Sequence, residues 1–394
     1  MRLVKILLFL CVLPSFIEAT TVSIGVLVSQ KLTTIIFSPL SGDYVITADS
    51  ARIILGNKDL AYLTYSNGKI SLKTLKGKIG TYSAIRIESV RETGTFKFKP
   101  VIPYGTLRSY DDDLEIRVVG KHLRVINHVN LDKYVAGVVK SEVGIASSLE
   151  LYKVQAIICR TYSLSNFRKH EADNYQLCDK VHCQVYAGRC AVTDPETGIM
   201  YSGAERITKA ASMTSGIIIV DDNLELVTAA FHSNCGGQTA NSEDVWSKPL
   251  PYLRSVRDTF CSHGRDARWK RRIPEKKWFS YLTKSCGLDP TESKFAKNAT
   301  SFSQGKRGRY FAGNQNIPLH KIRRDWRFKS AYFSIYKQYD DLIFSGKGFG
   351  HGVGLCQQGA MVMTDHGIDY KKIIHHYYTD VTLIDIGSLK YLLK

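Results

Sequence analysis

The sequence lacks the glycine-rich loops with which common folds bind nucleotides. Neither GxxxxGK[ST] nor a correctly spaced GxGxxG occurs in it, and this excludes the usual phosphate-binding loop. The GxSxG motif of many serine hydrolases is absent too. No internal repeat is visible along the 394 residues. The function must therefore be read from other motifs.

The sequence also has no long hydrophobic run. The apolar stretch at residues 6–13 is broken by Pro14 and bounded by Glu18, so it falls short of the ~20 residues of a membrane span. With the charged start before it, it predicts a secretory signal peptide at residues 1–19, cleaved near Ala19. An uncleaved anchor is the alternative. We therefore expect an exported protein in the periplasm or extracytoplasmic cell envelope.

Acidic residues are few: 36 Asp and Glu stand against 54 Lys and Arg, a net charge of +18. Such an excess favours polyanionic partners, namely nucleic acid, acidic membranes or acidic glycans. Export makes nucleic acid the least expected of these, and we predict none. Beyond Cys11, eight cysteines remain, and an oxidising compartment predicts that some form disulfides.

The pattern along the chain predicts an α+β protein with two halves of a core around an insertion. Residues 20–129 form a β-rich N-terminal part, and residues 130–253 form the first half of the core. Residues 254–341 are strongly basic and are predicted to form an inserted docking subdomain. Residues 342–394 form the second half with a glycine-rich loop.

Local signals place the first helices. Turns at 41–43 and 66–68 predict hairpins within the β-rich part. Helical spacing of apolar residues then runs from 131 to 140, and a second helix runs from 149 to about 167 after a cap at Ser147 or Ser148. These limits place Glu142 in a tight turn between two helices.

Four blocks of the sequence occur in an order and spacing that resemble a known family. They are residues 130–142, 153–162, 232–246 with 251–253, and 348–360. The chain resembles the SpoIID (stage II sporulation protein D) family, exported bacterial proteins that process peptidoglycan. The resemblance implies a lytic transglycosylase that cleaves the MurNAc-β-1,4-GlcNAc bond of peptide-stripped glycan strands and leaves 1,6-anhydroMurNAc ends.

The wider family also includes amidase enhancers. The alternative is therefore a non-catalytic glycan-binding activator of an N-acetylmuramoyl-L-alanine amidase. The occasion, whether sporulation, cell division or another remodelling of the wall, does not follow from the chemistry.

Glu142 matches the position of the family's catalytic residue. Ordinary glycoside hydrolases use two carboxylates, whereas a transglycosylase can use one as acid and then as base. That role requires partial desolvation, which raises the pKa of a carboxyl group toward the working pH. Taken alone, a glutamate at a helix junction is more often solvated or a capping residue.

The resemblance also implies a set of substrate-binding residues in two polar loops and on the long helix. Arg160 pairs with Glu142, with the muramic acid carboxylate, or with a structural acid. His351 orients Glu142 and substrate, or satisfies a buried carbonyl. Ser233 beside a histidine also suggests a serine hydrolase as a minor alternative. The set is Arg160, His232, Ser233, Asn234, Gly350, His351, Gln357 and Gln358.

A closely spaced group of cysteines and histidines matches a block that binds zinc in some family members. The ligands would be His170, Cys178, His182 and Cys183, two thiolates and two imidazoles for a tetrahedral structural site. A Cys178–Cys183 disulfide is the alternative. Catalysis in the family requires no cofactor, so any zinc would be structural.

The tryptophans of the basic segment have two interpretations. Trp269, Trp278 and Trp326 either stack on sugar rings or pack in a core, and packing is the commoner role. The basic clusters around them are most often a solvated face. They would alternatively attract the free lactyl carboxylates of stripped glycan.

Overall fold

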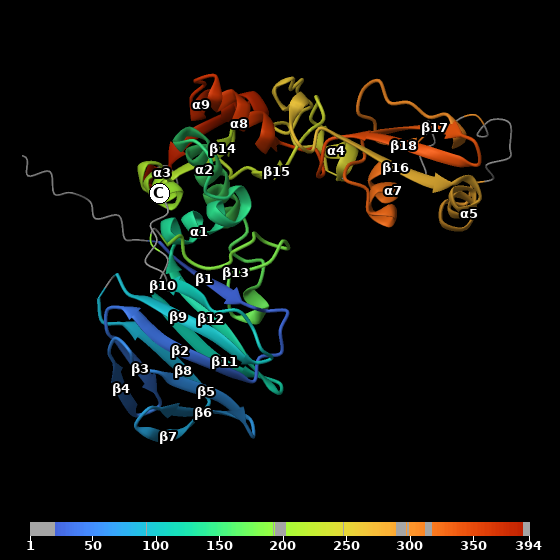
Figure 1. Ribbon diagram of the computed structural model, residues 1–394. Helices are drawn as coiled ribbons and strands as arrows, with labels where there is room; N and C mark the ends of the chain where they lie inside the picture. The colour runs from blue at the N-terminus through green and yellow to red at the C-terminus, as the bar shows by residue number, and fades with distance from the viewer. Residues whose placement is uncertain are drawn as a thin grey trace, which may run out of the picture.

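The computed structural model describes residues 20–388 except residues 92, 192, 194–201, 247, 289–296, 298 and 312–316. It has three bodies: a β-rich part, a helical part that packs on it, and a third body to one side of the helices (Figure 1). The predicted α+β class with a β-rich N-terminal part is confirmed. The predicted signal peptide at 1–19 lies outside the described residues.

The β-rich part consists of two sheets. One has the strand order β13-β1-β12-β11-β8-β3-β4 and the other β10-β9-β2-β5-β6-β7. The strands are β1 (Thr21–Val26), β2 (Thr34–Ser41), β3 (Tyr44–Ala48), β4 (Ala51–Leu55), β5 (Ala61–Ser66), β6 (Lys69–Thr74), β7 (Gly77–Tyr82), β8 (Ala84–Ser89), β9 (Thr95–Ile102), β10 (Arg108–Asp111), β11 (Asp113–Val119), β12 (His122–Asn130) and β13 (Leu177–Cys178).

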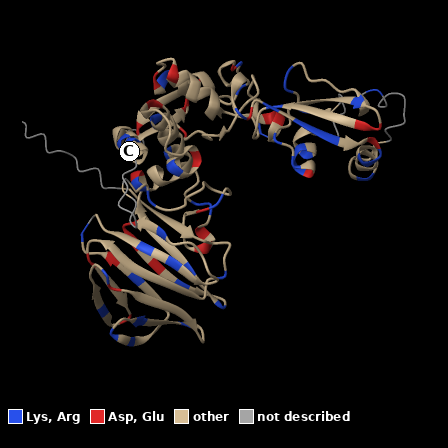
Figure 2. Ribbon diagram, viewed as in Figure 1, with Lys and Arg blue, Asp and Glu red and all other residues tan. Residues whose placement is uncertain are grey.

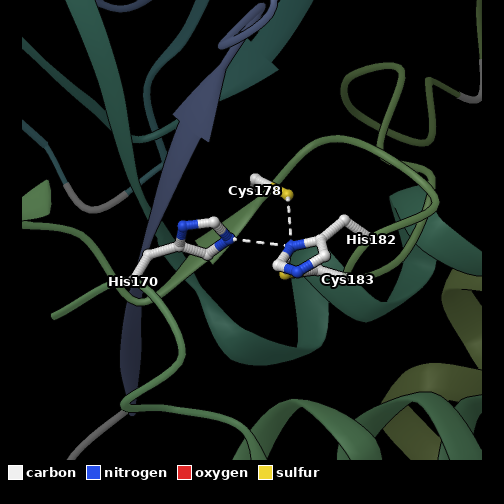
Figure 3. Close-up of side chains that lie close together, drawn as sticks. All are labelled: His170, Cys178, His182 and Cys183. Carbon is white, nitrogen blue, oxygen red and sulfur yellow. Dashed lines mark hydrogen bonds between the residues drawn. The ribbon is translucent and has the colours of Figure 1, made fainter.

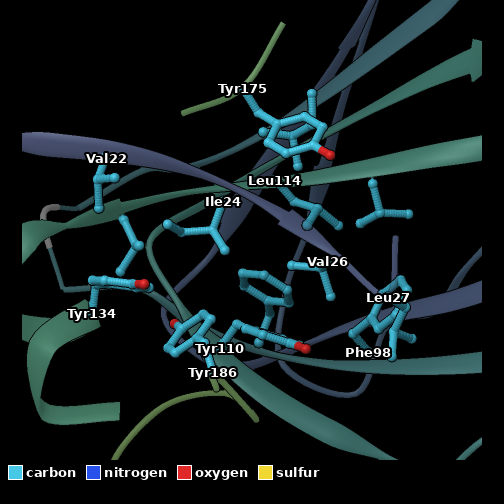
Figure 4. Packing of buried hydrophobic residues seen from close by; sticks show 14 of the residues in the cluster. Val22, Ile24, Val26, Leu27, Phe98, Tyr110, Leu114, Tyr134, Tyr175 and Tyr186 are labelled. Atoms are coloured by element: carbon cyan, nitrogen blue, oxygen red, sulfur yellow. The ribbon is translucent and has the colours of Figure 1, made fainter. Parts of the chain in front are cut away.

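Alternating side chains hold the two sheets together. In β9, Phe96 and Phe98 are fully buried while Lys97 and Lys99 lie on the other face, as the period of two in a strand requires. Burial of each such aromatic side chain contributes about 1.5–3 kcal/mol. Figure 4 shows the core at the helical end, where Tyr186 joins it.

The two predicted turns differ in outcome. The 66–68 turn joins β5 to β6, which pair antiparallel as a hairpin, so this prediction is confirmed. The 41–43 turn joins β2 to β3, which belong to different sheets, and the hairpin prediction there is wrong. The same tight turn instead carries the chain from one layer to the other.

The first helix, α1, spans Leu131–Val143 and includes Glu142 in its last turn. Its N-cap is Asn130, whose side-chain oxygen accepts hydrogen bonds from two backbone amides of the first turn. Ser141 lies within the helix, where its hydroxyl donates to the Gly137 carbonyl one turn earlier, at 2.8 Å. The helix ends at Gly144, with φ of 77°. The predicted end at 140, with Glu142 in a separate turn, is therefore wrong.

The second helix, α2, spans Leu149–Ser165 and is capped by Ser148, one of the two predicted caps. It lies between two cores. Leu151, Val154, Ile157 and Ile158 pack in the core of the helical part, whereas Tyr152, Ala156 and Cys159 pack in the core of the β-rich part. Its side chains are therefore apolar on both sides, unlike those of a surface helix.

The rest of the helical part brings together segments from both sides of the basic segment. Helix α2 contacts α3, α8 and α9, and short strand pairs β14·β20 and β15·β19 join the segments. These elements are α3 (Ser202–Met213), β14 (Ile217–Asp221), β15 (Phe231–His232), α4 (Ser242–Val245), β19 (Leu355–Cys356), α8 (Gln357–Asp365), α9 (Tyr370–Tyr377) and β20 (Val381–Asp385), with short 3₁₀ turns η1 (Glu171–Asp173) and η2 (Phe260–His263).

The third body has a three-stranded antiparallel sheet and its own core. Its elements are β16 (Arg268–Pro274), α5 (Glu275–Cys286), α7 (Leu319–Trp326), β17 (Phe333–Gln338) and β18 (Asp341–Lys347), so this body continues past residue 341. Trp269 and Trp278 are buried in its core and Trp326 packs against it. The first two are therefore not available to stack on sugars.

Lysines and arginines gather on the outer strand β16 and on α7 of the third body, and others lie across the β-rich sheets (Figure 2). Along β16, Arg268, Lys270, Arg271 and Arg272 are exposed around the buried Trp269. Within the described part of the chain, no helix is both long and apolar enough to span a bilayer.

Candidate functional site

The carboxyl group of Glu142 is held by the segment that follows the Cys178–Cys183 loop. Its Oε1 accepts a hydrogen bond of 3.1 Å from the backbone amide of Val185. Two residues further on, the Ala187 amide donates to Ser141 Oγ at 3.3 Å. The end of α1 and residues 185–187 thus form one local structure around Glu142.

Buried tyrosines fix this segment against α1. The ring of Tyr186 lies 4.9 Å from that of Tyr134 and 5.8 Å from that of Tyr110, both fully buried. Gly137 allows the close approach, because a Cβ there would lie 2.5 Å from the Tyr186 ring and from the Gly188 carbonyl oxygen. The position of the Val185 amide therefore depends on the core.

Burial raises the pKa of Glu142 above the ordinary value of a glutamic acid, and the hydrogen bond from Val185 acts in the opposite direction. The end of α1 adds to the first effect, because the last turn of a helix carries partial negative charge and disfavours a carboxylate. Glu142 therefore has the electrostatic setting of a general acid.

A basic cavity of about 910 Å³ opens beside the end of α1. It shares Lys140, Gly144 and Ile145 with this end of the helix and its loop, although Glu142 does not itself line it. Among the described residues, Lys97, Lys99 and Lys140 make no ion pair. The other walls include Tyr104, Thr106, Leu107, Arg108, Ser109, Ala187, Arg189 and Ala191.

The sequence prediction missed this cavity. It looked for positive charge in residues 254–341, whereas the cavity takes its lysines from β9 and α1. The alternation of Phe96, Lys97, Phe98 and Lys99 predicts two lysines on one face of a strand. That signal alone does not say that the face lies beside Glu142.

Arg160 does not pair with Glu142. Its side chain is 1% exposed, and its guanidinium donates to Asp132 Oδ1 at 2.8 and 3.1 Å. It also donates to the carbonyls of Ile217 and Ala211. Of the alternatives stated above, the structure favours the structural ion pair, because these bonds leave no exposed donor for a glycan.

His232 and His351 lie together, with ring centroids 5.5 Å apart. His351 Nδ1 accepts a hydrogen bond from the Val353 amide, and His232 Nδ1 lies 3.2 Å from the Val353 carbonyl. Burial lowers the pKa of His351 to about 4, and burial with the nearby His351 and Arg307 lowers that of His232 well below its usual value. Both rings are therefore neutral near pH 7.

Ser233, Asn234 and Gln358 form one network with Asp266. The Gln358 amide donates to Ser233 Oγ and to Asp266 Oδ2, and Ser233 Oγ donates to the same carboxylate at 3.3 Å. Asn234 is fully buried and bonds the Gln358 amide oxygen at 2.8 Å. Ser233 thus faces a carboxylate and an amide rather than a histidine, so the geometry does not support a serine hydrolase.

The glycine-rich loop packs closely on this network. Gly350 has φ of 114°, and a Cβ there would lie 2.7 Å from that of His232. Gln357 begins α8, as one reading of the sequence predicted, and its amide donates to Gln155 Oε1 at 3.5 Å. Gln155 in turn bonds the thiol of Cys159, whose raised pKa of about 12 reflects burial first and also the Glu142 carboxylate. Hydrogen bonds thus link the start of α8 to Cys159 of α2.

The predicted metal ligands do lie together (Figure 3). The ligand atoms of His170, Cys178, His182 and Cys183 all lie within 4.8 Å of one another. His182 Nδ1 lies 3.2 Å from His170 Nε2, 3.9 Å from Cys178 Sγ and 4.0 Å from Cys183 Sγ. A tetrahedral zinc site has N–N edges of about 3.3 Å and N–S edges of about 3.6 Å. The donor set fits such an ion.

Disulfides were predicted, but all eight cysteines from Cys159 to Cys356 are free thiols, and that prediction is wrong for this structure. Cys178 pairs through β13 with Gly25 in the β-rich sheet. A zinc ion here would tie the sheet edge to the loop that precedes Val185.

We expect Cys183→Ser to lower the zinc content of the purified protein by one ion per chain and its melting temperature by several degrees. The physical reason is that binding of a structural ion stabilises only the folded state. Elemental analysis and thermal melts measure both. Cys286→Ser, at a half-exposed cysteine outside the cluster, should change neither quantity, and an unaltered zinc content in Cys183→Ser would contradict the assignment.

Comparison with known proteins supports the resemblance, and the matched family segment contains the first two of the four blocks. Residues 119–220 match the family model SpoIID, stage II sporulation protein. The chain is 27% identical over 282 residues to stage II sporulation protein D of Bacillus amyloliquefaciens and to that of Bacillus subtilis (strain 168), covering 68% of this chain and 79% of each relative.

It is also 28% identical over 298 residues to the amidase enhancer of Bacillus subtilis (strain 168), covering 63% of this chain and 40% of that protein. The matched segment, residues 119–220, contains β12, α1 and α2, and hence Glu142 and its Val185 partner. The chain therefore contains a segment, residues 119–220, that matches the SpoIID family, and about two thirds of its length is similar to stage II sporulation protein D.

Proposed function

We propose that this protein is an exported lytic transglycosylase that cleaves peptide-stripped peptidoglycan strands, with Glu142 as its single acid and base. The observation that carries the proposal is the state of Glu142. Its carboxyl group is partly buried at the end of α1, has a raised pKa, and lies next to a basic cavity. Similarity to the SpoIID family supports the same chemistry.

In this mechanism Glu142 first donates its proton to the glycosidic oxygen as the bond from C1 to that oxygen breaks. The resulting carboxylate then takes the proton of the C6 hydroxyl group while O6 forms a bond to C1 of the same sugar. The proton returns to Glu142, and no water is consumed. The Val185 amide holds the carboxylate through both steps, because it can donate a hydrogen bond to either protonation state.

The basic cavity suits the charge of the substrate. A strand without stem peptides carries a lactyl carboxylate on each muramic acid, and clefts of positive potential attract such chains. Lys97 and Lys99 present their ammonium groups from β9, and Lys140 does so from α1. The glycan would thus lie between the β-rich part and the end of the helix.

The triple change Lys97→Ala, Lys99→Ala and Lys140→Ala is expected to raise KM for stripped glycan about tenfold, because three partly exposed cations at about 0.5 kcal/mol each sum to that factor. Steady-state kinetics at two salt concentrations measures KM for both proteins. The difference in KM between parent and variant should be smaller at high salt, because salt screens the charges. The matched control replaces the exposed Lys270, Lys276 and Lys284 of the third body. A larger effect of the control would place glycan binding on the third body instead.

The activity itself is tested by the mass of the products. The purified protein is incubated with peptide-stripped glycan, and released ends are analysed by mass spectrometry. Ends lighter by one water than reducing ends support transglycosylation, whereas reducing ends would indicate hydrolysis. Strands that are bound but never cut would overturn the enzymatic proposal.

Similarity to an amidase enhancer favours one second candidate, a glycan-binding activator of a cell-wall amidase. In that role Glu142 would be dispensable, and the protein would increase the rate at which a partner amidase releases stem peptides from intact peptidoglycan. An amidase assay with and without the parent protein separates this role from cleavage of the strand.

A further inference from the structure

A second group of metal-binding side chains lies behind the glycine-rich loop. It consists of Cys235, Asp258, Cys261 and Cys356, all fully buried, with ligand atoms that all lie within 4.8 Å of one another. They come from three separate segments: the chain after β15, the η2 turn with the loop before it, and the first residue before α8. We propose that these four side chains bind a structural zinc ion.

The distances are those of a compact coordination site. Cys235 Sγ lies 3.3 Å from Cys261 Sγ and 3.2 Å from Asp258 Oδ2. In tetrahedral zinc sites, S–S edges are about 3.8 Å and S–O edges about 3.5 Å. The observed pairs are therefore within about half an ångström of the separation that a shared ion imposes.

Two backbone amides point at the sulfur of Cys356. It accepts hydrogen bonds from the backbone amides of Cys235, at 3.2 Å, and Gly359, at 3.3 Å. It is also the N-cap of α8, nine residues long, where the helix dipole favours negative charge. Thiolate is the form in which cysteine binds zinc.

Asp258 adds a buried carboxyl group to the three sulfurs. Asp258 is fully buried, and a buried carboxylate beside three sulfurs is costly unless it is neutralised. Tyr377 donates to its Oδ2 and the Phe260 amide to its Oδ1. Arg307 reaches the Cys235 carbonyl with one guanidinium nitrogen at 2.6 Å. A divalent ion bound to this carboxylate would offset that cost.

The number of sulfurs favours a metal over a disulfide. A Cys235–Cys261 bond would use two of the three cysteines and would not include Cys356 or Asp258. A metal ion uses all four side chains. Three thiolates and one carboxylate form a closed set that suits zinc, whereas Mg²⁺ and Ca²⁺ prefer oxygen ligands.

Such an ion would hold the glycine-rich loop in place. Cys356 follows that loop directly, and Cys235 follows Asn234, whose amide donates to the Cys261 carbonyl at 3.1 Å. The site lies apart from Glu142 and does not depend on the proposed catalytic activity. Its ligands belong to the segments that hold the polar network of Ser233 and Gln358.

The test counts metal ions in the full-length protein by elemental analysis. The parent is expected to contain two zinc ions per chain, one in each cluster, and Cys261→Ser and Cys356→Ser each to contain one. Cys286→Ser, outside both clusters, should keep two. The double variant Cys178→Ser with Cys183→Ser leaves the second cluster intact, and we expect it to keep one ion. If that folded variant contained no metal, the proposal would be overturned.

Cobalt substitution and thiol mapping complete the experiment. Thiolate-to-cobalt absorption of the parent should fall by about three fifths in Cys356→Ser, since three of the five thiolates of the two clusters belong to this site. Alkylation of the denatured, unreduced parent in the presence of a chelator should modify all three cysteines. A linked Cys235–Cys261 peptide in that map would show a disulfide instead and refute the proposal.

Discussion

Glu142→Gln is expected to lower the rate of anhydro-end release roughly 10²- to 10⁴-fold, the range that a general acid–base residue contributes. Glutamine keeps an oxygen that accepts the Val185 hydrogen bond but cannot donate or receive the catalytic proton. Binding of stripped glycan should therefore persist. The measurement compares turnover and glycan affinity for parent and variant. Glu205→Gln, at an exposed glutamate of α3, is the control.

The pH dependence follows from the raised pKa of Glu142. Cleavage begins from the protonated acid, so the rate should fall as pH rises through that pKa. In the folded state the carboxyl group holds its proton more tightly than in the unfolded chain, so its ionisation costs stability above the folded-state pKa. At neutral pH, Glu142→Gln should melt no lower than the parent. A lower melting temperature, or full activity in the variant, would contradict the assigned role.

Arg160→Met is expected to destabilise the fold by about 3 kcal/mol, because two carbonyls each lose a hydrogen bond from a charged donor, at about 1.5 kcal/mol each, and the partly exposed Asp132 loses its ion pair. The change removes the guanidinium from Asp132 and from the carbonyls of Ile217 and Ala211, of which the latter keeps a long hydrogen bond from Thr214 Oγ1. These contacts join α1, α2 and β14, so their loss should destabilise the helical part as a whole. Denaturant unfolding gives the free energy.

Arg168→Met is the matched control, since Arg168 follows α2 and is exposed. It should change stability by less than about 0.5 kcal/mol. The result that would restore a binding role for Arg160 is a variant with unchanged stability and weakened affinity for stripped glycan.

Local sequence signals predicted elements better than their connections. The cap at Ser148 and the hairpin at 66–68 depend on nearby residues alone, and both are present. The 41–43 turn has the same local chemistry, yet its following strand joins the other sheet. No local signal states which layer a strand will enter. The end of α1 was misplaced because Gly144, rather than Ser141, stops the helix.

Site residues could be predicted from the sequence where a side chain belongs to a recognisable motif. They could not be predicted where the contribution comes from the backbone or from a distant segment of the chain. Glu142 and the cluster around His182 were found from motifs. The Val185 amide could not be, because any residue type except proline supplies an N–H group. Asp132 belongs to the same sequence block as Glu142, but no local sequence pattern indicated that Asp132 would form an ion pair with Arg160. The Cys235 cluster was missed because its residues are separated by up to 121 positions.

The place of α2 between two hydrophobic cores has a consequence for folding. Its two faces are shared by the β-rich part and the helical part, so neither core can lose this helix without exposing apolar surface of the other. These two parts should therefore open as a single cooperative unit. The third body has a core of its own and can fluctuate or unfold without disturbing Glu142.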